Sequence, residues 1–293
     1  MEVRRINHGK GKLSTTVCIA DDYGSEDYGF RVASVIVMGE KEAVVIDTQF
    51  TLANAHRVAA EVLDSGRSLK AVILSHAHPD HYFGTEVFQN AFPEAAVYAL
   101  EEDIQVMHDD LFGKIEHWEK EIGITNCPHK PFNVTPLKEG FVELEGEKIE
   151  VKGKVWGDKK YNSRIWIPSI KTLIGSDILF NEAHPFTCEL TRKQWKHWID
   201  QLNEMESMDA EVIIPGHARP GMPFDKSSIE YTRNYLIATA EEVERCKTPA
   251  EFYYAMSMRF PKSVLLRSNE MNANVFLGGR EWYDAEENEE DIE

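Results

Sequence analysis

The sequence predicts a mixed α/β protein, and three observations lead to this prediction. Segments rich in β-branched residues alternate with segments whose apolar residues recur every three or four positions. The chain has 293 residues, 42% of them hydrophobic, which is enough to bury a large core in one domain, with or without an extension. No run of about 18 consecutive apolar residues occurs, so a transmembrane helix is not expected.

The N-terminal part is predicted to contain a β-hairpin followed by a helix. Residues 31–38 and 41–46 are rich in valine and isoleucine, which favour strands, and Gly39-Glu40 supplies the turn between them. Residues 52–64 have Ala, Val and Leu at spacings of three and four, which is typical of an amphipathic helix.

The next segment continues this alternation of strands and helices. Residues 70–75 are predicted to form a strand, 84–92 a helix that stops near Pro93, and 95–100 another strand. Residues 101–123 have an apolar stripe at helical spacing, and we expect this helix to cap one side of an active site. The stripe consists of Ile104, Met107, His108, Leu111, Ile115 and Trp118.

Strands resume in the second half of the chain, at 141–151, 163–167 and 171–175. Residues 191–207 form a strongly amphipathic helix, and its two tryptophans are predicted to belong to the core. A strand over 211–214 then leads into the sequence Pro-Gly-His.

The C-terminal part is predicted to be a helical extension. Helices over 226–246 and 249–259 account for much of residues 226–283. Residues 284–293 are predicted to form an acidic, disordered tail, because they cannot bury enough apolar surface to offset the entropy of ordering. Residues 1–225 would then form the main domain.

The loop Ser75-His76-Ala77-His78-Pro79-Asp80-His81 is the most informative stretch of the chain. It follows the apolar run 71–74 and has the pattern H-x-H-x-D-H. Imidazoles suit zinc and similar divalent metals, and the carboxylate adds charge and a hard oxygen. The loop therefore predicts a metal site, and a polar loop with coincidental histidines is the weaker alternative.

This loop and three further motifs resemble the metallo-β-lactamase superfamily over residues 30–220. In chain order the motifs are Val44-Val45-Ile46-Asp47-Thr48, the loop 76–81, Gly175-Ser176-Asp177 and Pro215-Gly216-His217. The resemblance implies a four-layer αββα sandwich, with two central sheets and helices outside. Within this domain, 101–123 would be a helical cap insertion.

The resemblance also implies a dinuclear centre with two divalent metal ions, zinc in the first place and manganese or iron as alternatives. The ligands that it implies are His76 and His78 for the first metal, Asp80, His81 and His217 for the second, and Asp177 as a bridge.

Asp158 departs from the family's pattern, in which a third histidine reaches the first metal from a Gly-His motif. Counting back from the apolar run 165–168, the matching dipeptide is Gly157-Asp158. Asp158 could be a true ligand, an interpretation that the preserved length favours and that resembles a hydrolase branch with Gly-Asp at this point. Alternatively it is a loop residue beside a first metal that is weakly held or absent.

A carboxylate at position 158 would lower the positive charge of the centre by one. Water bound to the ions would then ionise at higher pH, so we expect an alkaline-shifted activity profile and tolerance of Mn²⁺. Asp158→His should move the profile of kcat/KM against pH to lower pH, and an unchanged profile would contradict this charge argument.

Two further residues have candidate roles near the metals. Asp47 is expected to orient a metal-binding histidine rather than to bind an ion. His184 follows Asp177 by seven residues. Three roles are open for it. It could form a hydrogen bond to the substrate during catalysis, replace the missing ligand of the first metal, or pack the loop.

The predicted activity is metal-dependent hydrolysis of a small molecule. A metal-bridging hydroxide would attack an ester, lactone or related acyl carbonyl, and Asp80 would orient it and later protonate the leaving group. Hydrolysis of β-lactams is the alternative within enzymes. A metal-binding or interaction protein whose first metal site has decayed is the alternative from another class.

Charge and cysteine usage limit the partners and the compartment. A net charge of −18 repels phosphate backbones, so nucleic acid is not an expected partner, and neither is a membrane. The N-terminus lacks the apolar region of a secretory signal, which favours a cytoplasmic location or a sequence that begins after processing. The apolar cap could also be the contact of a homodimer. Reduced, structural thiols are expected at Cys18, Cys127, Cys188 and Cys246.

Overall fold

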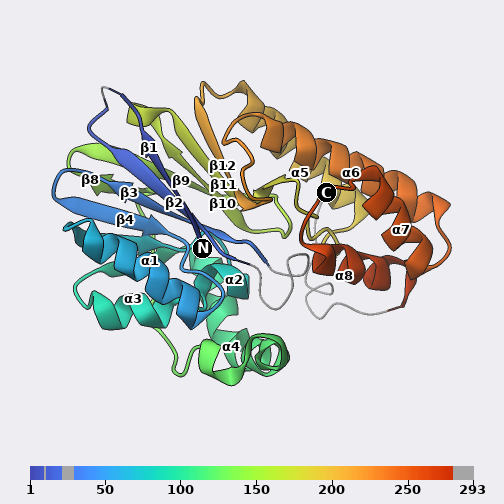
Figure 1. Cartoon of the computed structure of the whole chain (residues 1–293), viewed down its shortest axis with the longest axis horizontal. Helices are drawn as coiled ribbons and strands as arrows, with labels where there is room; N and C mark the ends of the chain where they lie inside the picture. Colours follow the sequence, from blue (N-terminus) through green and yellow to red (C-terminus); the bar gives the residue numbers. More distant parts are fainter. Residues whose placement is uncertain (10, 22–29, 280–293) are drawn as a thin grey trace. The chain divides into compact units, whose positions relative to one another are not determined.

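The computed structural model describes residues 1–9, 11–21 and 30–279, and contains two β-sheets with helices (Figure 1). One sheet has seven strands in the order β1-β2-β3-β4-β5-β6-β7, and the other has five in the order β12-β11-β10-β9-β8. The predicted α/β class is therefore confirmed. The predicted disordered tail, 284–293, lies outside the described residues.

The seven-stranded sheet lies in the first of two compact units, formed by Met1–Asp21, Val32–Gly153 and Ser163–Leu173. Its first strands are antiparallel, whereas β4, β5, β6 and β7 are parallel to one another. The hairpin predicted around Gly39-Glu40 is present, with Met38 opposite Ala43. The strands are β1 (Glu2–Asn7), β2 (Ser14–Ile19), β3 (Ala33–Met38), β4 (Glu42–Ile46), β5 (Ser68–Ile73), β6 (Ala96–Ala99) and β7 (Thr135–Pro136).

The helices of this unit are α1 (Leu52–Asp64), α2 (Pro79–Tyr82), α3 (Thr85–Ala91) and α4 (Glu101–Ile122), with the short η1 (Ile124–Asn126) after them. Thr51 begins α1 by accepting a hydrogen bond from the backbone N–H of Asn54. Helix α1 packs against α3 and β5. Gly84 permits the close approach before α3, because a Cβ there would lie 1.9 Å from the backbone oxygen of Thr48.

In the five-stranded sheet, one segment predicted as a single strand is a hairpin of two strands. The segment 141–151 is two strands that turn at Glu145-Gly146, and both residues have positive φ, 51° and 86°. Strand β11 also continues beyond the predicted end at 175. The strands are β8 (Phe141–Leu144), β9 (Glu147–Val155), β10 (Asn162–Ile167), β11 (Thr172–Asn181), with η2 (Pro168–Ile170) before it, and β12 (Val212–Ala218).

The second compact unit, of which 30–31, 154–162 and 174–279 are described, contains helices α5 (Arg192–Ser207), α6 (Ser227–Arg245), α7 (Pro249–Arg259) and α8 (Leu266–Leu277). Consecutive helices pack against one another, and α6 also contacts β12. The tryptophans of α5, Trp195 and Trp198, are buried. Helix α8 was not predicted, because its serine and asparagines have low helix propensity.

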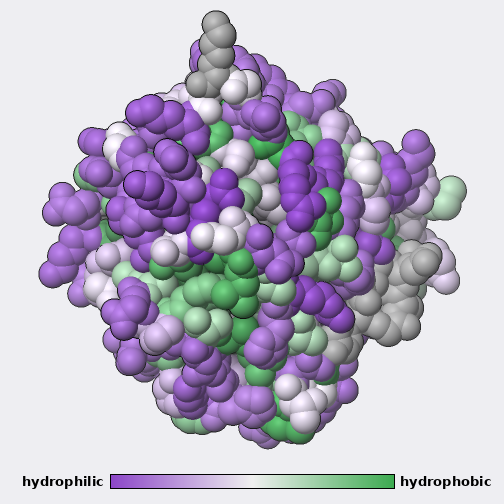
Figure 2. All heavy atoms as spheres, turned by 60° about the vertical axis from the view of Figure 1, so that its left-hand side comes forward, coloured by the Kyte–Doolittle hydropathy of each residue, from purple (hydrophilic) through white to green (hydrophobic). Residues whose placement is uncertain are grey.

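The remaining features of the fold concern the hydropathy of the surface, the state of the cysteines and the character of the helices. Hydrophilic residues dominate the face drawn in Figure 2, around a smaller hydrophobic area. The four cysteines are buried and none forms a disulfide, and burial raises the pKa of the Cys18 thiol to about 12 and that of Cys127 to about 11. Across the described ranges, no helix combines the length and the apolar character that crossing a bilayer requires.

Candidate metal centre

The H-x-H-x-D-H loop begins where two parallel strands end. Strands β4 and β5 pair in register with Ile46 opposite Ile73, so the residues that follow them meet at one edge of the sheet. The backbone N–H of Asp47 donates to the carbonyl of Ile73 at 2.9 Å. The loop then enters α2, where Pro79 occupies the first helical position, which its fixed φ favours.

Asp47 holds this loop through three hydrogen bonds. Its carboxylate accepts from the backbone N–H and the hydroxyl of Ser75, both at 2.8 Å, and Oδ2 lies 2.8 Å from Nδ1 of His81. The contact with His81 is the one expected of a residue that orients a metal-binding histidine. Because Nδ1 is engaged by the carboxylate, Nε2 is the nitrogen that His81 would present to an ion.

The remaining donors of the loop lie close together and are buried. The hydroxyl of Ser75 is 3.0 Å from Nδ1 of His76. The ring centroid of His76 lies 4.7 Å from that of His78 and 4.3 Å from that of His81. Oδ2 of Asp80 lies 3.6 Å from Nε2 of His81. One short loop therefore gathers three imidazoles and a carboxylate.

Asp158 is held by the backbone and by a side chain that sequence reasoning missed. Its backbone N–H donates to the carbonyl of Asp177 at 3.1 Å, and Nδ2 of Asn162 donates to its Oδ1 at 3.1 Å. A Cβ at Gly157 would lie 2.8 Å from Nδ2 of Asn162, so glycine permits this close packing. The signal in the sequence is an asparagine four residues after Asp158, and the structure shows that it is buried at the start of β10.

The Pro-Gly-His motif lies within β12, beside the strand that carries Asp177. Nε2 of His217 is 3.3 Å from Oδ2 of Asp177. A Cβ at Gly216 would lie 2.2 Å from Oδ1 of Asp177, so only glycine leaves space for this carboxylate. Nδ1 of His217 is hydrogen-bonded to the carbonyl of Phe30, and its ring stacks on Phe180 with centroids 5.3 Å apart.

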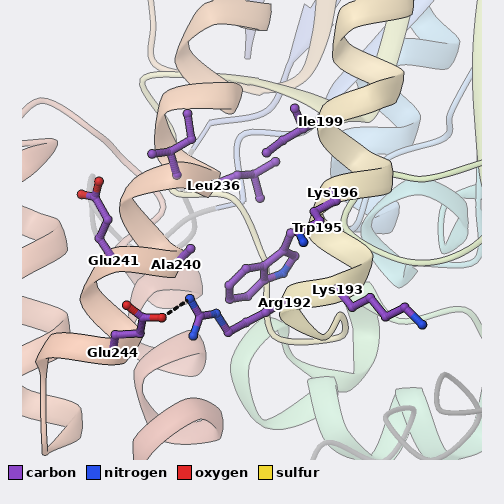
Figure 3. A pocket seen from close by; sticks show the side chains of 10 residues that line it. Arg192, Lys193, Trp195, Lys196, Ile199, Leu236, Ala240, Glu241 and Glu244 are labelled. Atoms are coloured by element: carbon purple, nitrogen blue, oxygen red, sulfur yellow. Dashed lines mark hydrogen bonds and ion pairs between the residues drawn. The ribbon is translucent and has the colours of Figure 1, made fainter.

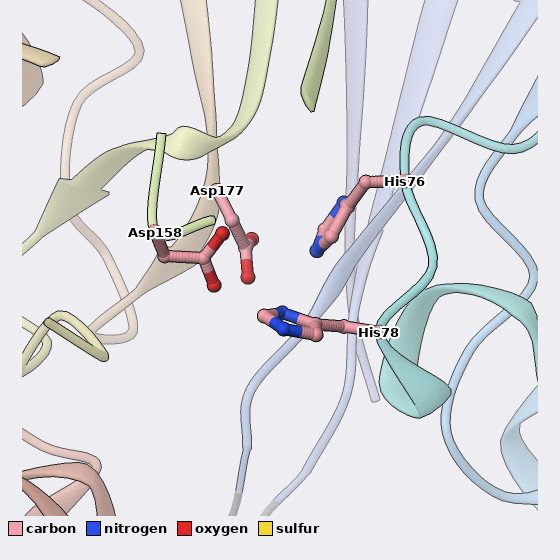
Figure 4. A group of neighbouring side chains, drawn as sticks. All are labelled: His76, His78, Asp158 and Asp177. Carbon is pink, nitrogen blue, oxygen red and sulfur yellow. The ribbon is translucent and has the colours of Figure 1, made fainter. Parts of the chain in front are cut away.

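Two groups of four buried side chains could each hold a metal ion, and Asp177 belongs to both. Within each group the candidate ligand atoms all lie within 4.8 Å of one another. Figure 4 shows the first group, in which two carboxylates and two imidazole rings converge. The groups are His76, His78, Asp158 and Asp177, and Asp80, His81, Asp177 and His217. Each residue proposed as a ligand belongs to one of these groups, and the binding of ions stays a prediction.

The chemistry of the donors fits divalent cations. Three carboxylates, those of Asp80, Asp158 and Asp177, are at most 6% exposed. Burying like charges close together is unfavourable unless a cation compensates them. Imidazole and carboxylate ligands suit zinc, and also manganese and iron. Divalent metals, in this family usually zinc, are therefore the ions that the arrangement favours.

His184 belongs to neither group, and its catalytic role stays a prediction. It is fully buried, its Nδ1 lies 2.9 Å from the hydroxyl oxygen of Tyr235, and burial lowers its pKa to about 3. With the hydroxyl of Tyr235 as the donor, Nδ1 of His184 is the acceptor in this contact. The imidazole is then neutral with its hydrogen on Nε2, for which the described residues supply no acceptor.

Comparisons with known proteins identify the family of the chain. A family model described as the metallo-beta-lactamase superfamily matches residues 27–217. The comparison with curated protein sequences found no match.

Several solved structures are similar in fold. A metallo-beta-lactamase from Pontibacter korlensis has a TM-score of 0.60 and 18% identity, over 80% of this chain and 99% of that one. The metallo-beta-lactamase IND-7 has a TM-score of 0.61 and 18% identity, over 80% and 98%. A metallo beta lactamase from Hirschia baltica has a TM-score of 0.55 and 16% identity, over 80% and 98%.

These structures share the fold, whereas the sequence match carries the family. The predicted fold class is confirmed, because the chain has the mixed α/β fold of these proteins, with two sheets. The matched range, 27–217, includes all four motifs that carried the resemblance. The chain belongs to the metallo-β-lactamase superfamily.

Proposed function

We propose that this protein is a hydrolase that uses two divalent metal ions to cleave an ester, lactone or related acyl bond of a small molecule. The observation that carries the proposal is the pair of buried groups that share Asp177. Members of this superfamily are usually metal-dependent hydrolases. Zinc is the first choice, and manganese or iron would suit the same donors.

The residues of the chain would divide the catalytic work. Bound ions would supply a Lewis acid for the carbonyl and would lower the pKa of a bound water below that of bulk water. Asp80, buried in the first turn of α2, would accept a proton from the attacking water and return it to the leaving group. Asp177, the member common to both groups, would hold the two positions at a fixed separation. His184 would offer its neutral Nε2–H to the substrate.

Asp158 favours two complete metal sites over an arrangement in which the first metal site has decayed. Its side chain is fully buried, and Asn162 and the backbone of Asp177 hold it in place. A ligand role accounts for a buried carboxylate at this position, because one of its oxygens lies among the candidate ligand atoms of the first group. We therefore assign Asp158 to the first metal.

The proposed substrate is small and partly hydrophobic. Within the first unit, Trp118 of α4 packs on Phe50 with centroids 5.3 Å apart, and Phe50 lies 5.8 Å from Phe83, the residue after α2. The helix predicted as a cap is thus anchored next to the metal loop, and it exposes Phe112. The net charge of −18 disfavours polyanions, including nucleic acid.

A metal count combined with a substrate panel tests the proposal. Protein purified without added metal should contain two ions per chain and hydrolyse at least one lactone or aryl ester. β-Lactams and a phosphodiester complete the panel, because the similarity to solved metallo-beta-lactamases, at 16–18% identity, indicates the fold and not the substrate. Asp177→Asn should lose both ions and the activity, whereas Asp200→Asn, exposed on α5, should keep them. One ion or none, with no turnover of any acyl substrate, would instead indicate a decayed site.

A further inference from the structure

A groove of about 600 Å³ lies between α5 and α6 (Figure 3), and none of the residues that line it belongs to the two metal-binding groups. Its floor is apolar: the side chains of Trp195 and Leu236 are almost fully buried beneath it, and Ile199 and Ile237 extend the apolar surface. Ile237 is 44% exposed, so the apolar surface of the groove is open to a ligand. The groove is therefore a candidate docking surface.

The rim of the groove is basic on the α5 side. Arg192, Lys193 and Lys196 all lie in the N-terminal part of α5, whose first turn contains no acidic residue. Arg192 forms an exposed ion pair with Glu244 of α6 at 2.7 Å, and Glu241 of α6, which also lines the groove, pairs with Arg259 at 2.6 Å. The N-terminal end of a helix adds a partial positive charge. On a chain of net charge −18, this edge suits an acidic ligand.

The chain itself supplies an acidic and aromatic segment close to this groove. Phe276, in the last turn of α8, packs edge-on against Trp195 with ring centroids 5.5 Å apart. Gly279 follows with φ of +67°, a conformation that reverses the chain direction at helix ends. Residues 280–293 contain Trp282, Tyr283, eight acidic residues and a single arginine.

We propose that residues 280–293 of the same chain occupy the groove between α5 and α6. Trp282 and Tyr283 would cover the apolar floor, and the acidic residues that follow would lie along Lys193 and Lys196. Trp282 is six residues beyond Phe276, so a reach of about 20 Å is available to it. A short tether also gives an effective concentration on the order of millimolar, so even a weak contact would be populated.

A second copy of the chain is the competing occupant. Helices α6 and α7 also expose Ile237, Tyr254 and Met258, which another molecule could cover. The charge of the rim and the position of Phe276 favour the tethered segment, because neither feature would be needed for contact with a second copy. Dependence on protein concentration separates the two occupants.

Hydrogen exchange of the full-length protein tests the proposal. Amides in 281–287 should exchange about 10-fold or more slowly than in a synthetic peptide of the same sequence, since docking excludes water from them. Protection should weaken in about 0.5 M salt, which screens exposed charges. Lys196→Glu and Trp282→Ala should each lower the protection, whereas Lys262→Glu, an exposed lysine outside the groove, should not.

A fluorine label gives an independent readout that does not depend on exchange rates. In protein that contains 5-fluorotryptophan, Trp282→Phe identifies the signal of Trp282 among the six tryptophans. In the wild-type chain, the fluorine chemical shift of Trp282 should differ from its shift in the free peptide. In Lys196→Glu the shift should move toward the free-peptide value. Free-peptide exchange and shift in the wild-type chain would overturn the proposal. So would protection that increases with protein concentration, because a second molecule would then be the occupant.

Discussion

Asp47 arranges the metal loop without belonging to either metal-binding group. Its carboxylate accepts two hydrogen bonds from Ser75 and engages Nδ1 of His81. The ring orientation of His81 and the nitrogen that it presents are therefore set by a residue 34 positions earlier in the chain. A partner of this kind fixes the tautomer of a histidine ligand and raises its basicity.

We expect Asp47→Asn to weaken metal binding while the fold persists. The amide would place a donor against Nδ1 of His81 and favour the wrong tautomer, so affinity should fall about 10- to 100-fold. Competition with a chromophoric chelator measures this change, with circular dichroism as the check on folding. Glu42→Gln, a half-exposed acid on β4, is the matched control. Equal metal affinities in the wild type and both variants would show that Asp47 does not influence metal binding.

His184 makes stability depend on pH in a defined direction. Its pKa is about 3 in the folded protein, against an ordinary value of 6.5, so between these values the unfolded chain binds more protons. The stabilisation is complete above pH 6.5 and is lost as the pH falls toward 3, by up to about 1.4 kcal/mol per pH unit.

Thermal unfolding against pH tests this contribution. His184→Asn keeps an acceptor for the hydroxyl of Tyr235 but cannot take up the proton, so its Tm should decline less on acidification than that of the wild type. His56→Gln, on the exposed side of α1, should follow the wild type. Identical slopes for His184→Asn and the wild type would show that another group carries the acid sensitivity.

At the scale of elements, the C-terminal helices hold the loop that follows β11. Asn272 of α8 accepts from the backbone N–H of Thr187 at 2.9 Å and donates to the carbonyl of Pro185 at 2.8 Å. The backbone N–H of His184 donates to the carbonyl of Val264 at 2.9 Å. The predicted extension therefore has a structural task, because it determines the conformation of the loop that carries His184.

We expect Asn272→Ala to destabilise the protein more than its small change in volume would suggest. The substitution leaves a buried N–H and a buried carbonyl without partners, each worth about 1–3 kcal/mol, so the free energy of unfolding should fall by about 3 kcal/mol. Urea denaturation measures the loss. Asn274→Ala on the same helix, partly exposed, should change it by less than about 0.5 kcal/mol. Similar losses in both variants would show that the hydrogen bonds of Asn272 to Thr187 and Pro185 do not stabilise the protein.

At the scale of the whole molecule, bound metals should dominate the response to chelators. Three buried carboxylates gather in the two metal-binding groups of a chain whose net charge is already −18. Ions that bind the folded chain alone stabilise it by roughly 3 kcal/mol each at a free concentration of 100 times Kd. We therefore expect EDTA to lower the Tm and two equivalents of Zn²⁺ or Mn²⁺ to restore it.

The Asp177→Asn variant provides the control for this experiment. Because Asp177 belongs to both groups, the Tm of the variant should already be low and should respond little to EDTA. Unchanged Tm in a wild-type sample that elemental analysis shows to be free of metal would mean that the carboxylates are compensated by the protein alone.

The sequence by itself determined the family, the metal loop and most of the helices and strands. These depend on local signals: histidines spaced after a buried strand, apolar residues at helical spacing, and glycines beside a functional residue. Gly216 is an example, since its lack of a side chain leaves the space that Asp177 fills. Such signals are contained in a few neighbouring residues, so they can be recognised before the chain folds.

Only the tertiary structure decided which distant groups support those local motifs. Phe30 and His217 are 187 residues apart, and His184 and Tyr235 are 51 residues apart, yet both pairs are hydrogen-bonded. Strands β1 and β2 and helix α8 likewise form through pairing and packing rather than propensity. The physical reason is that a buried polar group must find a partner somewhere in the folded chain, and its own sequence neighbours do not specify where.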